Sequence, residues 1–352
     1  MLITSTQQLT PPILTDLLKA GGQLDRGDVT GVEVRLTKRL LVSTVSRLEV
    51  SYSADAPVSA PRKLFLKTSL PDSAHHSRSE VEFYASLASS RPGPPFIKCF
   101  DACYSPEANA SHLLLEDLSG THFQPETPKP PSLELSRSAV AALAGFHAIW
   151  WEHPQLGHEI GKLYSPDELN ALVAGIETNV IAFINFLGDR LTPERRRVYE
   201  RLIVSRHEVW GRLTDPRGLT VTHGDMHWWN FLYPIDTAAD RVRIFDWQLW
   251  HVDSGPRDLA FLTALGGFAE RRPEIEHDLM DHYYDGLISH GVTGYSSDDL
   301  WDDYRRAALR NLNIPVIFWS QGRDEAFWSA LLERSFASFE ELECAELIEG
   351  LS

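Results

Sequence analysis

Cysteine is scarce in this chain, which has only Cys99, Cys103 and Cys344 among its 352 residues. So few cysteines cannot form the disulfide framework of a small secreted domain. The pair Cys99-x-x-x-Cys103 has no second pair of metal ligands nearby, so the sequence predicts no zinc site. We therefore expect a protein of a reducing compartment, the cytoplasm.

Long apolar segments and basic charge are also missing. No run of about eighteen apolar residues occurs, so we expect no transmembrane helix. The start of the chain, MLITSTQQLTPPIL, lacks the charged and apolar regions of a signal peptide. Lys and Arg number 33 against 49 Asp and Glu, which gives a formal net charge of −16. This balance predicts no nucleic-acid or membrane partner, and an acidic cleft would favour a cationic substrate.

What the sequence does contain is an ordered set of polar residues in its second half. His223-Gly224-Asp225 is followed by Asn230 and then by Asp246, which ends an apolar run. An acid, an amide and a second acid in this order suit phosphoryl transfer from a magnesium nucleotide. In such a reaction Asp225 would orient and deprotonate the attacking hydroxyl, while Asn230 and Asp246 would hold Mg²⁺.

The spacing of these residues also predicts local structure. The run Leu219–Val221 indicates a strand that leads to the motif, and Gly224 permits a tight turn. A hairpin is predicted next, with one strand over residues 230–233 and the other over 242–245. Its second strand would return Asp246 to the side of Asn230.

These motifs resemble the aminoglycoside phosphotransferase and choline kinase family, whose members read H-G-D-x-x-x-x-N and then D-[WF]. The resemblance extends to Asp258-Leu259-Ala260. It is weaker toward the protein kinases, because Gly224 replaces their arginine, Trp247-Gln248 replaces Phe-Gly, and no A-P-E element follows. The family resemblance implies an α+β, bilobal, protein-kinase-like fold and a magnesium-dependent kinase that uses ATP or GTP. It also implies that His223 braces the catalytic loop and that Asp258 supports it from behind.

A phosphate-binding lysine is expected in the first half of the chain. Residues 63–68 alternate as a strand, so Phe65 and Lys67 share one face. Lys67 is the candidate to reach the α- and β-phosphates, and a helical glutamate should hold it. Glu80 lies with Phe83 at helical spacing and should point inward, whereas Glu82 should point to solvent. Phe65 has two open interpretations, stacking on the base or packing in the core.

Two further nucleotide contacts are expected. The phosphate-covering loop should lie between Val34 and Val50, where no G-x-G-x-x-G occurs but Ser43 and Thr44 offer hydroxyl and N–H groups. The apolar run Leu113–Leu115 predicts a buried strand that ends in a hinge. Backbone groups from Glu116 to Leu118 would pair there with the purine edge.

The hinge divides the predicted architecture, and a hydrophobic content of 43% suits a chain that folds throughout. We expect a small, β-rich, nucleotide-binding N-lobe over residues 1–115 and a hinge over 116–120. A larger and mainly helical C-lobe, with the catalytic and acceptor-binding residues, should cover 121–352. Helices are predicted over 139–151 and after capping residues at Ser165, Thr192 and Ser297.

Several features allow more than one interpretation. His223, Asp225 and His227 form an H-x-D-x-H pattern that could bind a metal, but no further ligand set accompanies it. His147 is expected to be a buried structural histidine. Trp228, Trp229, Trp247 and Trp250 lie near the motifs and could bind an ammonium group, although core packing explains most of them better.

The function predicted from these features is phosphate transfer to a hydroxyl group of a small molecule. The acceptor stays open among aminoglycosides, macrolides, choline or ethanolamine, homoserine and other amino alcohols or sugars. The alternative is a nucleotide-binding pseudokinase or scaffold protein, against which the presence of all five core residues speaks.

Overall fold

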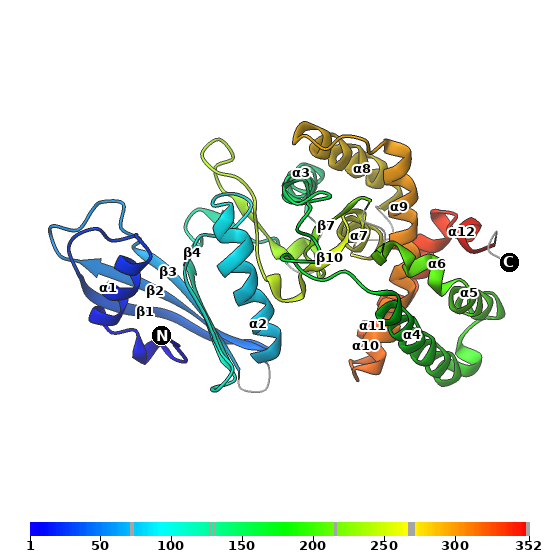
Figure 1. Ribbon diagram of the computed structural model, residues 1–352, viewed down its shortest axis with the longest axis horizontal. Helices are drawn as coiled ribbons and strands as arrows, with labels where there is room; N and C mark the ends of the chain where they lie inside the picture. The colour runs from blue at the N-terminus through cyan, green and yellow to red at the C-terminus, as the bar shows by residue number, and fades with distance from the viewer. Residues whose placement is uncertain (71–73, 127–128, 130, 215–216, 267–271, 350–352) are drawn as a thin grey trace. The chain divides into compact units, whose positions relative to one another are not determined.

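The computed structural model of the chain describes residues 1–70, 74–126, 129, 131–214, 217–266 and 272–349 (Figure 1). The chain divides into two compact units. Unit 1 comprises Met1–Gln124 and Asn230–Trp250, and unit 2 comprises Pro125–Trp229 and His251–Ser352. Unit 1 contains an antiparallel sheet and unit 2 is mainly helical, which confirms the predicted α+β class. The lobe and hinge boundaries expected from the sequence stay a prediction.

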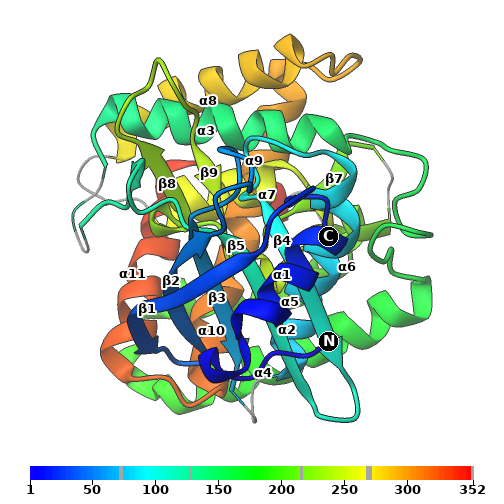
Figure 2. The same ribbon diagram turned by 90° about the vertical axis from the view of Figure 1, so that its left-hand side faces the viewer.

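Unit 1 is built on a five-stranded sheet. Its strands are β1 (Val29–Arg39), β2 (Ser43–Tyr52), β3 (Lys63–Ser69), β4 (Cys99–Ser105) and β5 (Ala110–Glu116). They lie in the order β1-β2-β3-β5-β4, and every neighbouring pair is antiparallel (Figure 2). The register places Lys67 opposite both Val45 on β2 and Leu113 on β5. The strand predicted to carry Lys67 is therefore the central strand of the sheet.

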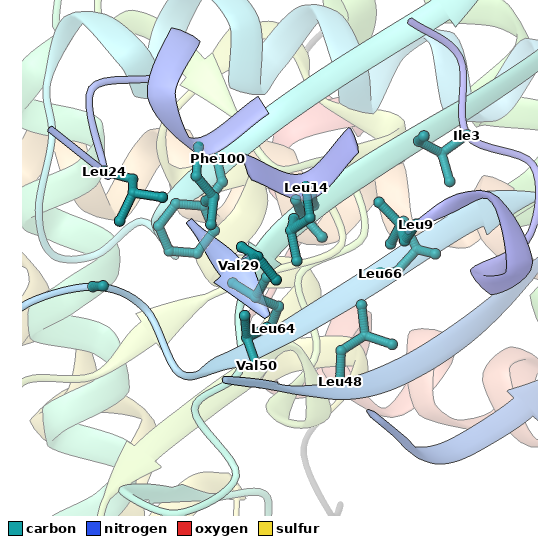
Figure 3. Packing of buried hydrophobic residues seen from close by; sticks show 13 residues of the cluster. Ile3, Leu9, Leu14, Leu24, Val29, Leu48, Val50, Leu64, Leu66 and Phe100 are labelled. Carbon is teal, nitrogen blue, oxygen red and sulfur yellow. The ribbon is translucent and has the colours of Figure 1, made fainter. Parts of the chain in front are cut away.

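Alternation along β3 separates the core of unit 1 from its functional face. Leu64 and Leu66 are buried in a cluster with helix α1 (Pro11–Ala20), which includes Leu14 (Figure 3). Phe65 and Lys67 are half-buried on the opposite face, because successive side chains of a strand point to opposite sides. The burial of Leu64 and Leu66 on one face of β3 thus places Lys67 on the other face. A short 3₁₀ helix (Thr6–Gln8) precedes α1.

Helix α2 (Ala74–Glu82) packs against β5 and continues as a π-helix (Phe83–Ala88). The predicted hairpin is present as β8 (Phe231–Pro234) and β9 (Arg243–Ile244), with Phe231 opposite Ile244. Strand β6 (His122–Phe123) pairs with β8 to complete a three-stranded sheet. A 3₁₀ turn (Trp228–Asn230) precedes β8, and another (Trp247–Leu249) follows Asp246.

Unit 2 contains the remaining helices and a two-stranded sheet. The helices are α3 (Leu133–Ile149), α4 (Pro166–Leu187), α5 (Pro193–Val204), α6 (Arg206–Trp210), α7 (Pro256–Ala260), α8 (Arg272–Ser289), α9 (Ser297–Arg310), α10 (Ile314–Ser320), α11 (Glu325–Glu341) and α12 (Glu346–Glu349). Short 3₁₀ segments cover Gly188–Arg190, Gly211–Thr214 and Asn311–Asn313, and a π-helix covers Phe261–Leu265. Strands β7 (Leu219–Thr222) and β10 (His251–Ser254) pair antiparallel.

The predicted helix starts can be compared with the observed caps. Ser165 caps α4 through a capping box with Glu168, and Thr192 caps α5, as expected. The cap of α9 is Ser296 rather than Ser297, because Asp299 lies three residues after Ser296 and its side chain bonds back to it. Helix α3 begins at Leu133, six residues before the predicted start, after its cap Ser132.

Helix α4 differs from the expectation of no membrane-spanning segment. Residues Pro166–Arg190 are long and apolar enough to cross a membrane by length and composition, with a mean hydropathy of 1.6. The core helix of a soluble protein passes the same test. One face of α4 is buried within unit 2, through Leu169, Val173, Ile176, Val180, Phe183, Ile184 and Leu187.

Candidate active site

A cavity of 370 Å³ opens in unit 1 on the face of β3 that carries Phe65 and Lys67. Its apolar lining comes from both pieces of the unit, namely Leu40, Val45, Phe65, Tyr84, Ile97, Leu115, Leu118, Phe123, Leu232 and Phe245. Its charged lining includes Lys67, Glu80 and Asp246. Apolar walls with a few convergent charged groups are typical of a pocket for a small polar ligand.

Lys67 contacts two acidic side chains of the cavity, its predicted partner Glu80 and also Asp246, which the sequence predicted only as a magnesium ligand. Its Nζ lies 2.7 Å from Glu80 Oε2 and 2.7 Å from Asp246 Oδ1. The side chains of Lys67 and Glu80 are 13% and 3% exposed, whereas that of Asp246 is 39% exposed. Burial alone would lower the pKa of Lys67, but the charges of Glu80 and Asp246 outweigh it and raise that pKa. Lys67 is therefore a fixed positive charge at the polar end of the cavity.

The choice between the two candidate glutamates is settled by the geometry of α2. Glu80 is buried and faces Lys67, while Glu82 is exposed and pairs with Arg78 one turn earlier. The amphipathic spacing that predicted Glu80 to point inward is confirmed as a structural feature. Its role in catalysis stays a prediction.

Asn230 and Asp246 lie at the two ends of the β8–β9 hairpin. The N–H of Phe245 donates to the carbonyl of Asn230 at 3.2 Å, so the residue that precedes Asp246 is bonded to Asn230. The side chain of Asn230 is buried, and Asp246 adopts a left-handed conformation with φ 70°. A carboxylate and an amide are oxygen donors of the kind that Mg²⁺ prefers, so the donor set fits this ion.

The competing metal site is not formed. Among the residues that the structure describes, no group of three or more His, Cys, Asp and Glu could hold a metal ion. His223, Asp225 and His227 therefore do not form such a group in the structure.

Glu116, Asp117 and Leu118, which belong to the predicted hinge, line the cavity. The N–H of Glu116 donates to Lys98 and that of Asp117 donates to Lys63, while the carbonyl of Leu118 accepts from Thr121. The N–H of Leu118 makes no hydrogen bond within the described ranges. Leu118 is 7% exposed and lines the cavity. A buried N–H at a cavity wall is a donor that a ligand can satisfy.

The phosphate-covering segment expected between Val34 and Val50 stays a prediction. Ser43 and Thr44 do not line the cavity, whereas Leu40, Val45 and Arg47 do. In the register of the sheet, Val45 lies opposite Lys67 and Arg47 lies opposite Phe65. Alternation on β2 places Thr44 on the opposite face from Val45 and Arg47, but it does not separate Ser43 from them.

The His-Gly-Asp segment lies in unit 2, at the end of β7. Gly224 has φ 83°, a conformation that favours glycine, and it turns the chain after His223. Asp258 on α7 accepts the backbone N–H groups of both His223 and Gly224. Burial would raise the pKa of Asp258, but its hydrogen bond to His147 and the neighbouring imidazoles and N–H groups outweigh it, and the pKa is lowered. An ionised carboxylate therefore ties the turn to α7.

A second layer of side chains, formed by His147 and Tyr283, holds Asp258 in place. His147 on α3 is fully buried, with Nε2 3.2 Å from Asp258 Oδ2 and Nδ1 2.7 Å from the hydroxyl of Tyr283. Gly255 lies against this layer, because an added Cβ would come within 2.6 Å of the Tyr283 hydroxyl and 3.2 Å of His147 Nδ1. His147 is the buried structural residue that the sequence predicted.

Asp225 has the accessibility that a catalytic carboxylate needs. Its side chain is 37% exposed, and its Oδ2 lies 3.8 Å from His227 Nε2. Its backbone N–H donates to His223 Nδ1 at 3.3 Å, so His223 braces the residue that follows the turn. The structure thus brings Lys67, Glu80 and Asp246 together in unit 1, and His223, Asp225 and Asp258 in unit 2.

Comparison with known proteins identifies the family of the chain and solved structures with a similar fold. The model of the ecdysteroid kinase-like family matches residues 42–291. No curated protein sequence matches the chain.

Solved structures resemble the chain over nearly its whole length. A candidate aminoglycoside phosphotransferase from Ralstonia eutropha is 13% identical, with 95% of this chain and 98% of that chain covered and a TM-score of 0.58. Choline kinase from Cryptosporidium parvum is 10% identical, with 97% of each chain covered and a TM-score of 0.57. Choline kinase from Streptococcus pneumoniae is 13% identical, with 96% and 100% covered and a TM-score of 0.52. At these identities the likeness concerns the fold.

Proposed function

Because this chain belongs to the ecdysteroid kinase-like family and is a kinase-like small-molecule phosphotransferase, we propose that it transfers the γ-phosphate of ATP or GTP to a hydroxyl group of a small molecule, with Mg²⁺. The observation that carries the proposal is the 370 Å³ cavity, whose apolar walls end at Lys67, Glu80 and Asp246. A nucleoside triphosphate needs the same combination, an apolar slot for the base and a fixed cation for the phosphates.

The base of the nucleotide would occupy the apolar part of the cavity. Phe65 lines this part and is half-buried, so its ring is available to stack on a purine. The N–H of Leu118 would donate to the purine edge, and the carbonyl of Glu116 is the acceptor expected beside it. Both ATP and GTP meet these requirements.

The phosphates would lie at the polar end. Lys67 would orient the α- and β-phosphates, and Glu80 would hold Lys67 by the ion pair at 2.7 Å. Asp246 and Asn230 would hold Mg²⁺, which neutralises charge on the phosphate oxygens when it is bound. Ser43 and Thr44, the residues expected to cover the phosphates, begin β2 and do not line the cavity.

Asp225 has one role in the proposed chemical step. Its carboxylate accepts the proton of the acceptor hydroxyl as that oxygen bonds to the γ-phosphorus. The bond between the γ-phosphorus and the β–γ bridging oxygen breaks, and the nucleoside diphosphate leaves with the electron pair. His223 keeps Asp225 in place through its bond to the Asp225 N–H.

Two classes of acceptor deserve testing. The net charge of −16 favours a cationic amino alcohol or amino sugar. The description of the matched family adds a steroid alcohol as the second class. The three free cysteines and the nucleotide donor fit a protein of the reducing cytoplasm.

The test combines nucleotide binding with an acceptor panel. Thermal unfolding should shift upward with ATP or GTP only when magnesium is present, because a ligand that binds the folded state stabilises it. Phosphate transfer from γ-labelled ATP and GTP should then be measured against amino alcohols, aminoglycosides, macrolides and steroid alcohols, with Asp225→Asn as the inactive control. Binding of nucleotide without transfer to any acceptor, in wild type and control alike, would favour a pseudokinase or scaffold protein instead.

A further inference from the structure

Glu80 is bracketed by two contacts that come from one short segment of the chain. The indole N–H of Trp250 donates to the carbonyl of Ser79, the residue before Glu80, with an N···O distance of 2.8 Å. Phe83, three residues after Glu80, stacks on Trp247 with ring centroids 4.0 Å apart and an angle of 9° between the rings. Both tryptophans belong to the segment that begins with Asp246.

The contact at Phe83 lies where α2 changes its hydrogen bonding. Phe83 opens the π-helical turn that continues α2 to Ala88. Its ring is fully buried, and Phe96 approaches it edge-on at 5.7 Å while Trp250 lies at 6.1 Å. π-Helical turns are rare and often occur at functional sites. This turn is held by aromatic rings on several sides, so the end of α2 has little freedom to rotate.

These contacts connect the two acidic partners of Lys67. Asp246 is bonded to Lys67 directly, and the residues that follow Asp246 hold the helix that carries Glu80. We propose that Trp250 is a positioning residue, which fixes α2 through the Ser79 carbonyl so that Glu80 stays on Lys67. This inference rests on the proposed function, in which Lys67 orients the phosphates.

Trp250 acts on the site indirectly. Trp250 is not among the described residues that line the cavity, so it does not contact a ligand there. Its effect must pass through the helix that carries Glu80, by the hydrogen bond to the Ser79 carbonyl and the ring contact with Phe83. Removal of the indole N–H should therefore change the position of the glutamate and leave the cavity walls in place.

The first experiment removes the N–H and keeps an aromatic ring. Trp250→Phe should lower kcat by roughly two- to tenfold, the range expected for one neutral hydrogen bond, and change the nucleotide KM less. Trp319→Phe on α10 is the matched control, because the indole N–H of Trp319 makes no hydrogen bond within the described residues and its ring packs on Phe183 and Phe186. Its kcat should equal that of the wild type.

The second measurement is independent of activity. Amide hydrogen exchange should become faster over residues 77–88 in Trp250→Phe and stay unchanged there in Trp319→Phe, with thermal unfolding midpoints as a check on folding. Phe83→Leu removes the other contact and should accelerate exchange over the same residues. If the wild type phosphorylates no acceptor, the proposed function fails, yet the exchange data still decide whether Trp250 fixes α2.

A double-mutant cycle tests the route through Glu80. Residues that act through one another give non-additive effects. In a Glu80→Gln background, Trp250→Phe should therefore lower kcat no further. The inference is overturned if Trp250→Phe lowers kcat by the same factor in both backgrounds, or if exchange over residues 77–88 does not change.

Discussion

The carboxylate of Asp258 accepts the backbone N–H of Gly224 at 3.0 Å, although the two residues are 34 positions apart in the chain. Its second oxygen accepts the N–H of His223. One side chain thus provides the hydrogen-bond acceptors for two neighbouring N–H groups of the turn. Asp258 is 1% exposed, which means that water cannot take its place. The turn that presents Asp225 is therefore held from behind by a single buried carboxylate.

Asp258→Asn should destabilise the protein and slow turnover. The amide keeps the shape but offers one acceptor and an NH₂ donor, which would face an N–H group of the turn. Loss of a charged hydrogen bond in a buried site costs about 1.5–3 kcal/mol of unfolding free energy. Urea denaturation measures this change, and equal stability of the variant and the wild type would show that the carboxylate does not hold the turn.

Acidification should remove the stabilisation of the folded state that Asp258 provides. Its pKa in the folded protein is lowered below the ordinary value of 3.8, so the stabilisation is present above pH 3.8 and is lost as the pH falls through the folded-state pKa. The difference in unfolding free energy between wild type and Asp258→Asn should shrink as the pH falls below 3.8. Urea titrations at neutral pH and at pH values around and below that point test this, and a difference that grows on acidification would contradict it.

Asp225→Asn should separate binding from chemistry. The amide cannot accept the proton of the acceptor hydroxyl, so kcat should fall by roughly two to four orders of magnitude, the scale of general-base catalysis. Nucleotide affinity should stay close to that of the wild type, because Asp225 is not among the residues that line the cavity of unit 1. Steady-state kinetics measures kcat and calorimetry measures nucleotide affinity. Near-normal turnover would remove Asp225 from the mechanism.

The two proposed magnesium ligands, Asp246 and Asn230, should differ in importance. Asp246→Ala removes a charged ligand and should abolish the magnesium-dependent part of nucleotide binding, whereas Asn230→Ala removes a neutral one and should be milder. Asp246→Asn is the control for the backbone, because asparagine tolerates the left-handed conformation that Asp246 adopts at φ 70°. Wild-type binding of Mg-ATP by both alanine variants would refute the metal assignment.

Phe65 and Lys67 should affect different parameters. Phe65→Ala should weaken nucleotide affinity by roughly tenfold, since stacking of an aromatic ring on a base contributes about 1–3 kcal/mol in nucleic-acid binders. Lys67→Ala should depress kcat more than binding, because its charge acts on the phosphates in the transition state. Calorimetry and kinetics on both variants distinguish the two effects. Unchanged affinity in Phe65→Ala would exclude stacking.

Local periodicity accounts for the site features that the sequence predicted. Two-residue alternation placed Phe65 and Lys67 on one face, and helical spacing turned Glu80 inward. The hairpin was predictable for the same reason, because its strand residues and turn lie within one short segment. These features depend on neighbours in the chain, which a single sequence displays directly.

Contacts over long separations could not be read from the sequence. Lys67 and Asp246 are 179 positions apart, and Trp250 and Ser79 are 171 apart. The sequence pointed to Glu80 alone as the partner of Lys67, and no local pattern marks a tryptophan that bonds a distant carbonyl. Arg47 was missed because it joins the cavity only through the register of β2 against β3.

The discontinuity of unit 1 has a consequence for biosynthesis. Residues 125–229 are synthesised between its two pieces, and the cavity needs Leu232, Phe245 and Asp246 from the second piece. A nascent chain that ends near Gln124 can form the five-stranded sheet but has neither the hairpin nor the second partner of Lys67. The ribosome must therefore synthesise about 250 residues before this cavity can be complete, and at 5–20 residues per second the end of the second piece follows the end of the first by roughly 6 to 25 seconds.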